Sequence, residues 1–117
     1  MKTASLTQDL AYSDNKPVIQ VLFESESTKE IRIALKKGQV MKEHKTPFPI
    51  VVELFSGQVD FGVNGSVQHL SSGSLIALEG NLLHDLTAIE DSVVRLSLSL
   101  NDKIERVEKI ETTSVSG

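Results

Sequence analysis

Short strand-like runs, each closed by turn-forming residues, constrain the fold of this chain more than any other feature of its sequence. Turn signals stand at 25–28, 36–39, 56–58, 64–65, 71–73 and 79–81. Apolar, often β-branched runs lie between them, at 18–24, 30–35, 40–44, 50–55, 59–63, 75–78, 82–89 and 93–100. The Asn64-Gly65 pair is the strongest hairpin signal, because both residues tolerate positive φ. Such spacing predicts an all-β sandwich or barrel.

Two of these runs alternate cleanly between apolar and polar residues, which indicates strands with one buried face. The residues that we expect to point into the core are Ile31, Ile33, Leu35, Val94, Leu96, Leu98 and Leu100. The run 50–55 is different, because it is apolar on both faces, and such a run is typical of a strand covered on both sides. A second sheet or a second subunit would provide the second cover, and we expect a homodimer.

Composition narrows the class of protein. A chain of 117 residues with 39% hydrophobic and 24% charged residues has the length and balance of one folded domain. Its net charge of −4 argues against general binding to nucleic acid or to an anionic membrane. Without cysteine it has neither disulfides nor thiolate metal ligands. We find no apolar run typical of a signal peptide or a membrane span, so a cytoplasmic protein is expected.

The two ends of the chain differ from the middle. Residues 1–16 are polar and predict an N-terminal arm that is ordered only if it docks on another surface. We place the barrel at 17–100. The tail, 101–117, opens with a possible capping box at Asp102 and Glu105 and carries apolar residues every third position, which predicts a short helix.

Two glycine-opened segments, 38–44 and 73–84, each end on a histidine. They resemble the paired motifs of the cupin family, usually written G-x5-H-x-H-x3,4-E-x6-G and G-x5-P-x-G-x2-H-x3-N, over about residues 31–100. In the first motif Gly38, His44 and Gly57 match, while Thr46 replaces the second histidine and Ile50 the glutamate. The resemblance implies an RmlC-like jelly-roll barrel, or double-stranded β-helix.

The second motif is also incomplete. Gly73 and His84 match, whereas Glu79, Asn81 and Ala88 replace the proline, the second glycine and the asparagine. Family members with full motifs hold a divalent metal through three histidines and the glutamate. Only His44 and His84 remain here, and a working site normally needs three protein ligands. We therefore expect no metal or a weakly bound one, with Ni, Zn, Fe and Mn not distinguishable.

Two carboxylates stand near these positions, but strand alternation puts both on the wrong side. Glu53 follows Ile50 by three residues and Asp85 follows His84 directly, so each faces away from the site unless a bulge intervenes. His69 lies on another strand, and we interpret it as a surface residue.

The resemblance leaves two functions open. In the first, the barrel binds a small molecule without a complete metal site, and His44, Thr46 and His84 orient the ligand. The apolar wall of this expected cavity consists of Ile50, Val52, Leu54, Leu75 and Ala77. In the second, the chain is an enzyme: a metal-dependent dioxygenase or isomerase with a non-standard third ligand, or a metal-free epimerase-like catalyst. The metal-free enzyme would need an arginine in the pocket, and Arg32 and Arg95 both appear on outward positions.

Overall fold

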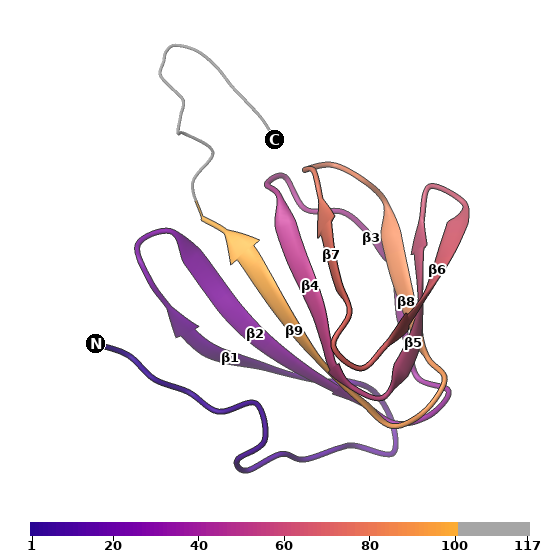
Figure 1. Ribbon diagram of the computed structural model, residues 1–117, viewed down its shortest axis with the longest axis horizontal. Helices are drawn as coiled ribbons and strands as arrows, with labels where there is room; N and C mark the ends of the chain where they lie inside the picture. The colour runs from indigo at the N-terminus through magenta and orange to yellow at the C-terminus, as the bar shows by residue number, and fades with distance from the viewer. Residues whose placement is uncertain (101–117) are drawn as a thin grey trace.

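The computed structural model describes residues 1–100, which form nine β-strands and, within that range, no helix (Figure 1). The strands are β1 (Val18–Glu24), β2 (Thr28–Leu35), β3 (Val40–His44), β4 (Ile50–Ser56), β5 (Gln58–Val63), β6 (Ser66–Ser71), β7 (Leu75–Leu78), β8 (His84–Ala88) and β9 (Ser92–Ser99). The predicted tail helix lies outside the described residues. In the part of the chain that the structure describes, no helix could cross a membrane.

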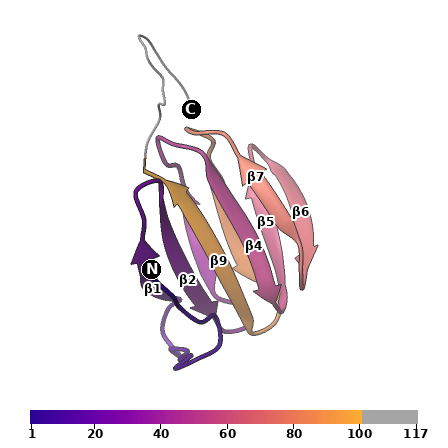
Figure 2. The ribbon, with the colours of Figure 1, turned by 60° about the vertical axis from the view of Figure 1, so that its left-hand side comes forward.

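The strands form two antiparallel sheets that face each other. One sheet has five strands in the order β1-β2-β9-β4-β7, and the other has four in the order β3-β8-β5-β6 (Figures 1 and 2). Most connections carry the chain from one sheet to the other, while β1/β2 and β5/β6 are hairpins. The second hairpin turns at Asn64 and Gly65, both with positive φ, as the sequence predicts. The all-β prediction is confirmed.

The core fills the space between the sheets with the inward residues of the alternating strands. Ile31, Ile33 and Leu35 of β2 are buried, as predicted, and Leu35 is fully inaccessible. On β9, Val94 is buried and Leu96 and Leu98 pack against the core. The prediction for Leu100 is wrong, because β9 ends at Ser99 and this side chain remains 37% exposed. Burial of these apolar surfaces provides about 25 cal/mol of stabilisation per Å².

The register of β7 corrects the expected cavity wall. Ile76 lies opposite Val52 and Leu78 opposite Ile50, and directly opposed residues in a sheet share a face. Ile76 and Leu78 therefore point inward, while Leu75, 64% exposed, and Ala77 point outward. The run 75–78 is too short and too uniformly apolar for its inward residues to be identified from the sequence.

The outer face of β4 remains partly open in this chain. Val51 and Phe55 are each 39% exposed, while Val52 and Leu54 on the inner face are buried. The fold therefore explains why the inner positions of β4 are apolar, but it does not explain why the outer positions are apolar too. A homodimer that covers the outer positions stays a prediction.

The N-terminal arm docks on the outer side of β2. Arg32 is only 3% exposed because the arm lies over it. Its Nη1 donates hydrogen bonds to the carbonyl oxygens of Ser5 (3.2 Å) and Gln8 (2.9 Å). Its Nη2 donates to the carbonyl oxygen of Asp9 (3.3 Å) and to Oε1 of Gln20 (2.6 Å). Arg32 thus faces outward, as predicted, and fastens the arm to the sheet.

Candidate functional site: a pocket with two histidines between the sheets

Two neighbouring strands bring His44 and His84 together. His44 is the last residue of β3, His84 is the first of β8, and the two are partners in the antiparallel pairing of these strands. Their ring centroids are 4.3 Å apart, with an angle of 61° between the ring planes. The prediction that the two motif histidines converge is therefore confirmed.

A bulge in β3 makes this convergence possible. Met41 pairs with Leu86 and His44 with His84, so three residue steps on β3 oppose two on β8. Met41 packs against the core from the inner face. Strict alternation would then turn His44 outward, and the extra residue of the bulge returns it to the side of Met41.

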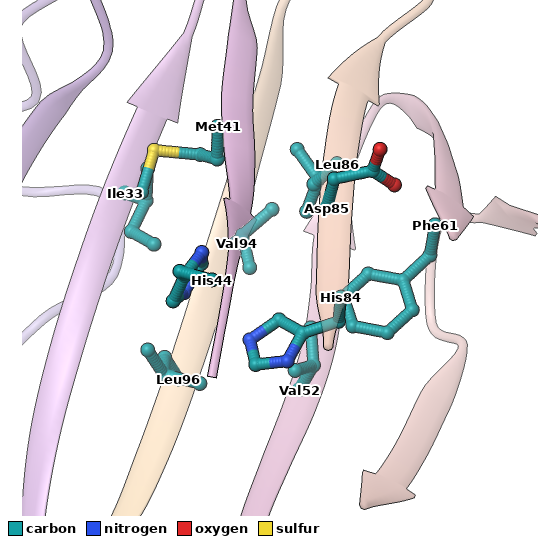
Figure 3. Close-up of a pocket in the computed structure, with 10 residues that line it drawn as sticks. All are labelled: Ile33, Met41, His44, Val52, Phe61, His84, Asp85, Leu86, Val94 and Leu96. Atoms are coloured by element: carbon teal, nitrogen blue, oxygen red, sulfur yellow. The ribbon is translucent and has the colours of Figure 1, made fainter. Parts of the chain in front are cut away.

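The two imidazoles line a pocket that is otherwise almost wholly apolar (Figure 3). Its empty space is about 350 Å³, which includes its open mouth. The lining residues come from both sheets: Ile33, Met41, His44, Val52, Phe61, His84, Asp85, Leu86, Val94 and Leu96. The expected pocket residues His44, Val52 and His84 are among them. An apolar concave wall with a few polar groups is the usual build of a small-molecule site.

His84 is the buried polar group of this pocket, with 5% of its surface exposed. Its Nδ1 lies 2.9 Å from the carbonyl oxygen of Leu82 and donates its proton there, because a carbonyl only accepts. The Phe61 ring stacks on the imidazole at a centroid distance of 5.7 Å. Burial, with a smaller contribution from His44, lowers the pKa of His84 below its ordinary value of 6.5, so the ring is neutral at pH 7.

His44 makes the matching backbone bond, although its side chain is more exposed. Its Nδ1 lies 2.8 Å from the carbonyl oxygen of Lys42 and donates to it. In both rings the neutral form then leaves Nε2 as an unprotonated acceptor. Within residues 1–100 neither Nε2 has a hydrogen-bond partner, and Figure 3 shows the His84 ring pointing toward that of His44.

The donor set does not fit a complete metal centre. Among the described residues there is no group of three or more His, Asp or Glu side chains that could hold a metal ion. Glu53 lies on the outer face of β4, where its Oε1 accepts a hydrogen bond from Nε of Arg95 at 2.8 Å. The buried Nε2 of His84 is an open ligand position, but two imidazole nitrogens fall short of the three protein ligands of a working site.

Asp85 also points away from the imidazoles (Figure 3). Its side chain lies over Gly62 of β5, where an added Cβ would stand 2.2 Å from Oδ1 of Asp85. The glycine therefore leaves room for this carboxylate on the outer face of the four-stranded sheet. As predicted, strand alternation separates Glu53 and Asp85 from the two histidines.

The structure does not bring Thr46 or Ile50 to this pocket. Thr46 lies in the bend after β3, where its Oγ1 donates to the carbonyl oxygen of Phe48 (3.0 Å) and its own carbonyl accepts from the amide of Asn81 (2.7 Å). Ile50, 3% exposed, lies in the core. Both are held by local packing, so their motif positions do not place them beside the imidazoles.

The structure adds Phe61, Met41 and Ile33 to the pocket wall. Alternation along β5 identifies Phe61 as an inward residue, but only the pairing of β5 with β8 in one sheet puts it beside His84. His69 behaves as predicted: its side chain is 54% exposed on the surface. Its Nδ1 lies 2.9 Å from Oδ1 of Asp60 and its Nε2 lies 3.1 Å from Oε1 of Gln58.

Comparison with known proteins identifies the fold. No family model and no curated protein matches this sequence. An RmlC-like cupin from Desulfovibrio desulfuricans, however, superimposes with a TM-score of 0.79 and 20% identity, over 85% of this chain and 96% of its own. The chain has the cupin fold.

Further solved structures agree with this assignment. A conserved protein of unknown function from Streptococcus pyogenes shares 21% identity, with a TM-score of 0.74 over 86% of this chain and 89% of its own. KdgF from a Halomonas species shares 15% identity, with a TM-score of 0.74 over 89% of this chain and 98% of its own. The predicted double-stranded β-helix is thereby confirmed. In this cupin fold the pocket lies between the two sheets, where the motif histidines meet.

Proposed function

We propose that this chain binds a small organic molecule in the cupin pocket, without a complete metal site. One observation carries the proposal: two imidazoles converge in an apolar cavity, and Nε2 of the buried His84 has no hydrogen-bond partner among residues 1–100. Nearly all buried polar groups in folded proteins have a partner, so an open acceptor facing a cavity favours a partner from outside the chain.

A second candidate is a metal-dependent enzyme of the dioxygenase or isomerase type. The observation that favours it is the backbone bond of each Nδ1, because histidines that ligate metals typically fix their second nitrogen in this way. His44 and His84 would supply two ligands through Nε2, and solvent or substrate would supply the rest. Imidazole suits Ni, Zn, Fe and Mn to different degrees, and the pair of rings does not select among them.

Metal analysis and ligand screening together test the two candidates. We expect protein purified without chelator to contain much less than one equivalent of metal. We also expect a fragment library to move amide resonances around Phe61, Val94 and His84. His84→Ala should abolish these shifts, whereas His69→Ala, a surface histidine, should leave them unchanged.

One equivalent of tightly held metal, lost in both His44→Ala and His84→Ala but kept in His69→Ala, would overturn the metal-free proposal in favour of the enzyme. A screen without any fragment that affects the pocket, in metal-free protein, would also count against small-molecule binding.

A further inference from the structure

We propose that the ligand of this pocket is a neutral, mainly apolar ring with one hydrogen-bond donor, of the phenol class, whose hydroxyl donates to Nε2 of His84. The inference rests on the proposed function and names its ligand class. It follows from three properties of the pocket: the direction of its hydrogen bonding, its lack of positive charge and the shape of its wall.

The hydrogen-bonding direction is set by the backbone. His44 and His84 each give their Nδ1 proton to a carbonyl oxygen two residues earlier in the chain. A neutral imidazole has one donor and one acceptor, so the pocket receives two Nε2 acceptors. The other side chains of residues 1–100 that line the pocket have no N–H or O–H group, apart from a protonated form of Asp85, which points outward. A ligand must therefore donate the hydrogen bond.

The charges around the pocket exclude anions. Arg95 lies on the outer face, where it pairs with Glu30 (2.9 Å) and Glu53 (2.8 Å). Arg32 is held by the N-terminal arm. Within residues 1–100, no Lys or Arg lines the pocket. A carboxylate or phosphate would lose its water without gaining an opposite charge, which is costly.

Cations and sugars fit poorly for related reasons. An ammonium group would donate to the imidazoles, but Asp85, the one carboxylate that lines the pocket within residues 1–100, is turned toward Gly62. A sugar would bring several hydroxyls into a wall with two acceptors, and the hydroxyls left unpaired would lose their hydrogen bonds to water without replacement. Burial, followed by the neighbouring His44, keeps the pKa of His84 low, which preserves its acceptor at pH 7. A single neutral donor matches these conditions.

The wall is suited to a flat ring. Phe61 stacks on His84, and the thioether of Met41 and the branched side chains of Ile33 and Val94 complete the surroundings (Figure 3). Aromatic rings gain from contact with a thioether and from offset stacking. The empty space of about 350 Å³ includes solvent at the open mouth, so the enclosed part is smaller and one ring is the largest group that we expect it to take.

The test compares ligands that differ in one group, in metal-free protein at pH 7.5. The probes are 4-methylphenol, its methyl ether 4-methylanisole, benzoate, benzylamine and glucose, titrated while amide and imidazole nitrogen resonances are recorded. We expect 4-methylphenol to bind about 10-fold more tightly than the ether, since a net hydrogen bond contributes about 1.4 kcal/mol. We also expect it to shift the Nε2 resonance of His84. The other three probes should leave the pocket unchanged.

Variants locate the contact. His84→Leu should bind the phenol and the ether equally, whereas the matched surface variant His69→Leu should keep the 10-fold preference. The wild-type comparison of phenol with ether stands by itself if His84→Leu does not fold. Equal binding of the pair by the wild type, or tighter binding of benzoate, benzylamine or glucose, would overturn the phenol class and leave small-molecule binding intact. Absence of pocket shifts with all five probes and with the fragment library would overturn both proposals.

Discussion

Arg32 and His84 are both buried polar side chains, 3% and 5% exposed, yet the chain treats them in opposite ways. The guanidinium of Arg32 has four protein acceptors: three backbone carbonyls and one amide oxygen. His84 has a partner for Nδ1 only, and within residues 1–100 its Nε2 has none. The difference teaches that burial by itself does not mark a site. A buried polar group that is hydrogen-bonded within the protein stabilises the fold. A buried polar group with an unpaired atom beside a cavity is instead a candidate for ligand binding.

The backbone of the N-terminal arm is folded so that it accepts the hydrogen bonds of Arg32. Oγ of Ser5 accepts hydrogen bonds from the amides of Thr7 (3.1 Å) and Gln8 (2.9 Å), and Asp9 has a φ of 55°. This turn directs three carbonyl oxygens toward one side, where Arg32 meets them. A short polar side chain such as aspartate is one of the residues that tolerates this backbone conformation.

The largest expected effect comes from replacing Arg32, whose buried guanidinium is hydrogen-bonded to the N-terminal arm. Arg32→Met should lower the free energy of unfolding by about 3 kcal/mol, since several hydrogen bonds from a buried charged group are lost together. Urea unfolding measures this, and limited proteolysis within residues 1–16 should become faster as the arm detaches. Lys42→Met, on an exposed position, is the control and should change stability little. A stable variant with a protected arm would show that Arg32 does not hold the arm.

A smaller effect is expected from pH, because it concerns one proton on the open group. The pKa of His84 in the folded chain lies below the ordinary value of 6.5, chiefly because of burial. Between these two pKa values the unfolded chain binds a proton that the folded chain does not. The free energy of unfolding is therefore unaffected by this proton above pH 6.5 and decreases as the pH falls below 6.5. Urea unfolding at pH 7.5 and at pH 5 should show a larger loss for the wild type than for His84→Leu. An equal loss in both would contradict the prediction.

The smallest effect is expected at the third histidine, His69. Its side chain is exposed, and both of its ring nitrogens have hydrogen-bond partners. Its nitrogens face Asp60 and Gln58 on the surface, and exposed pairs of this kind contribute about 0–1 kcal/mol. His69→Ala should change the free energy of unfolding by less than about 0.5 kcal/mol at pH 7.5. A loss comparable to that of Arg32→Met would mean that exposure, too, is a poor guide to the role of a polar side chain in this fold.

Much of the fold could be predicted from the sequence because its signals are local. Period-two alternation identified Ile31, Ile33 and Leu35 as core residues, and the Asn64-Gly65 pair identified its hairpin. The resemblance to cupin motifs identified His44 and His84 as the converging pair. It also predicted Thr46 and Ile50 as pocket residues, and this prediction was wrong, because a motif position does not say how a replaced side chain packs.

The sequence by itself determined that short alternating strands would bury one face each and that two histidines stood on motif positions. Only the tertiary structure decided the inward residues of β7, the bulge between Met41 and His44, the cover over Arg32 and the open nitrogen of His84. The physical reason is that alternation is a property of one strand. Register, bulges and hydrogen-bond partners arise between strands that are far apart in the chain, and a shift of one residue turns every side chain to the other face.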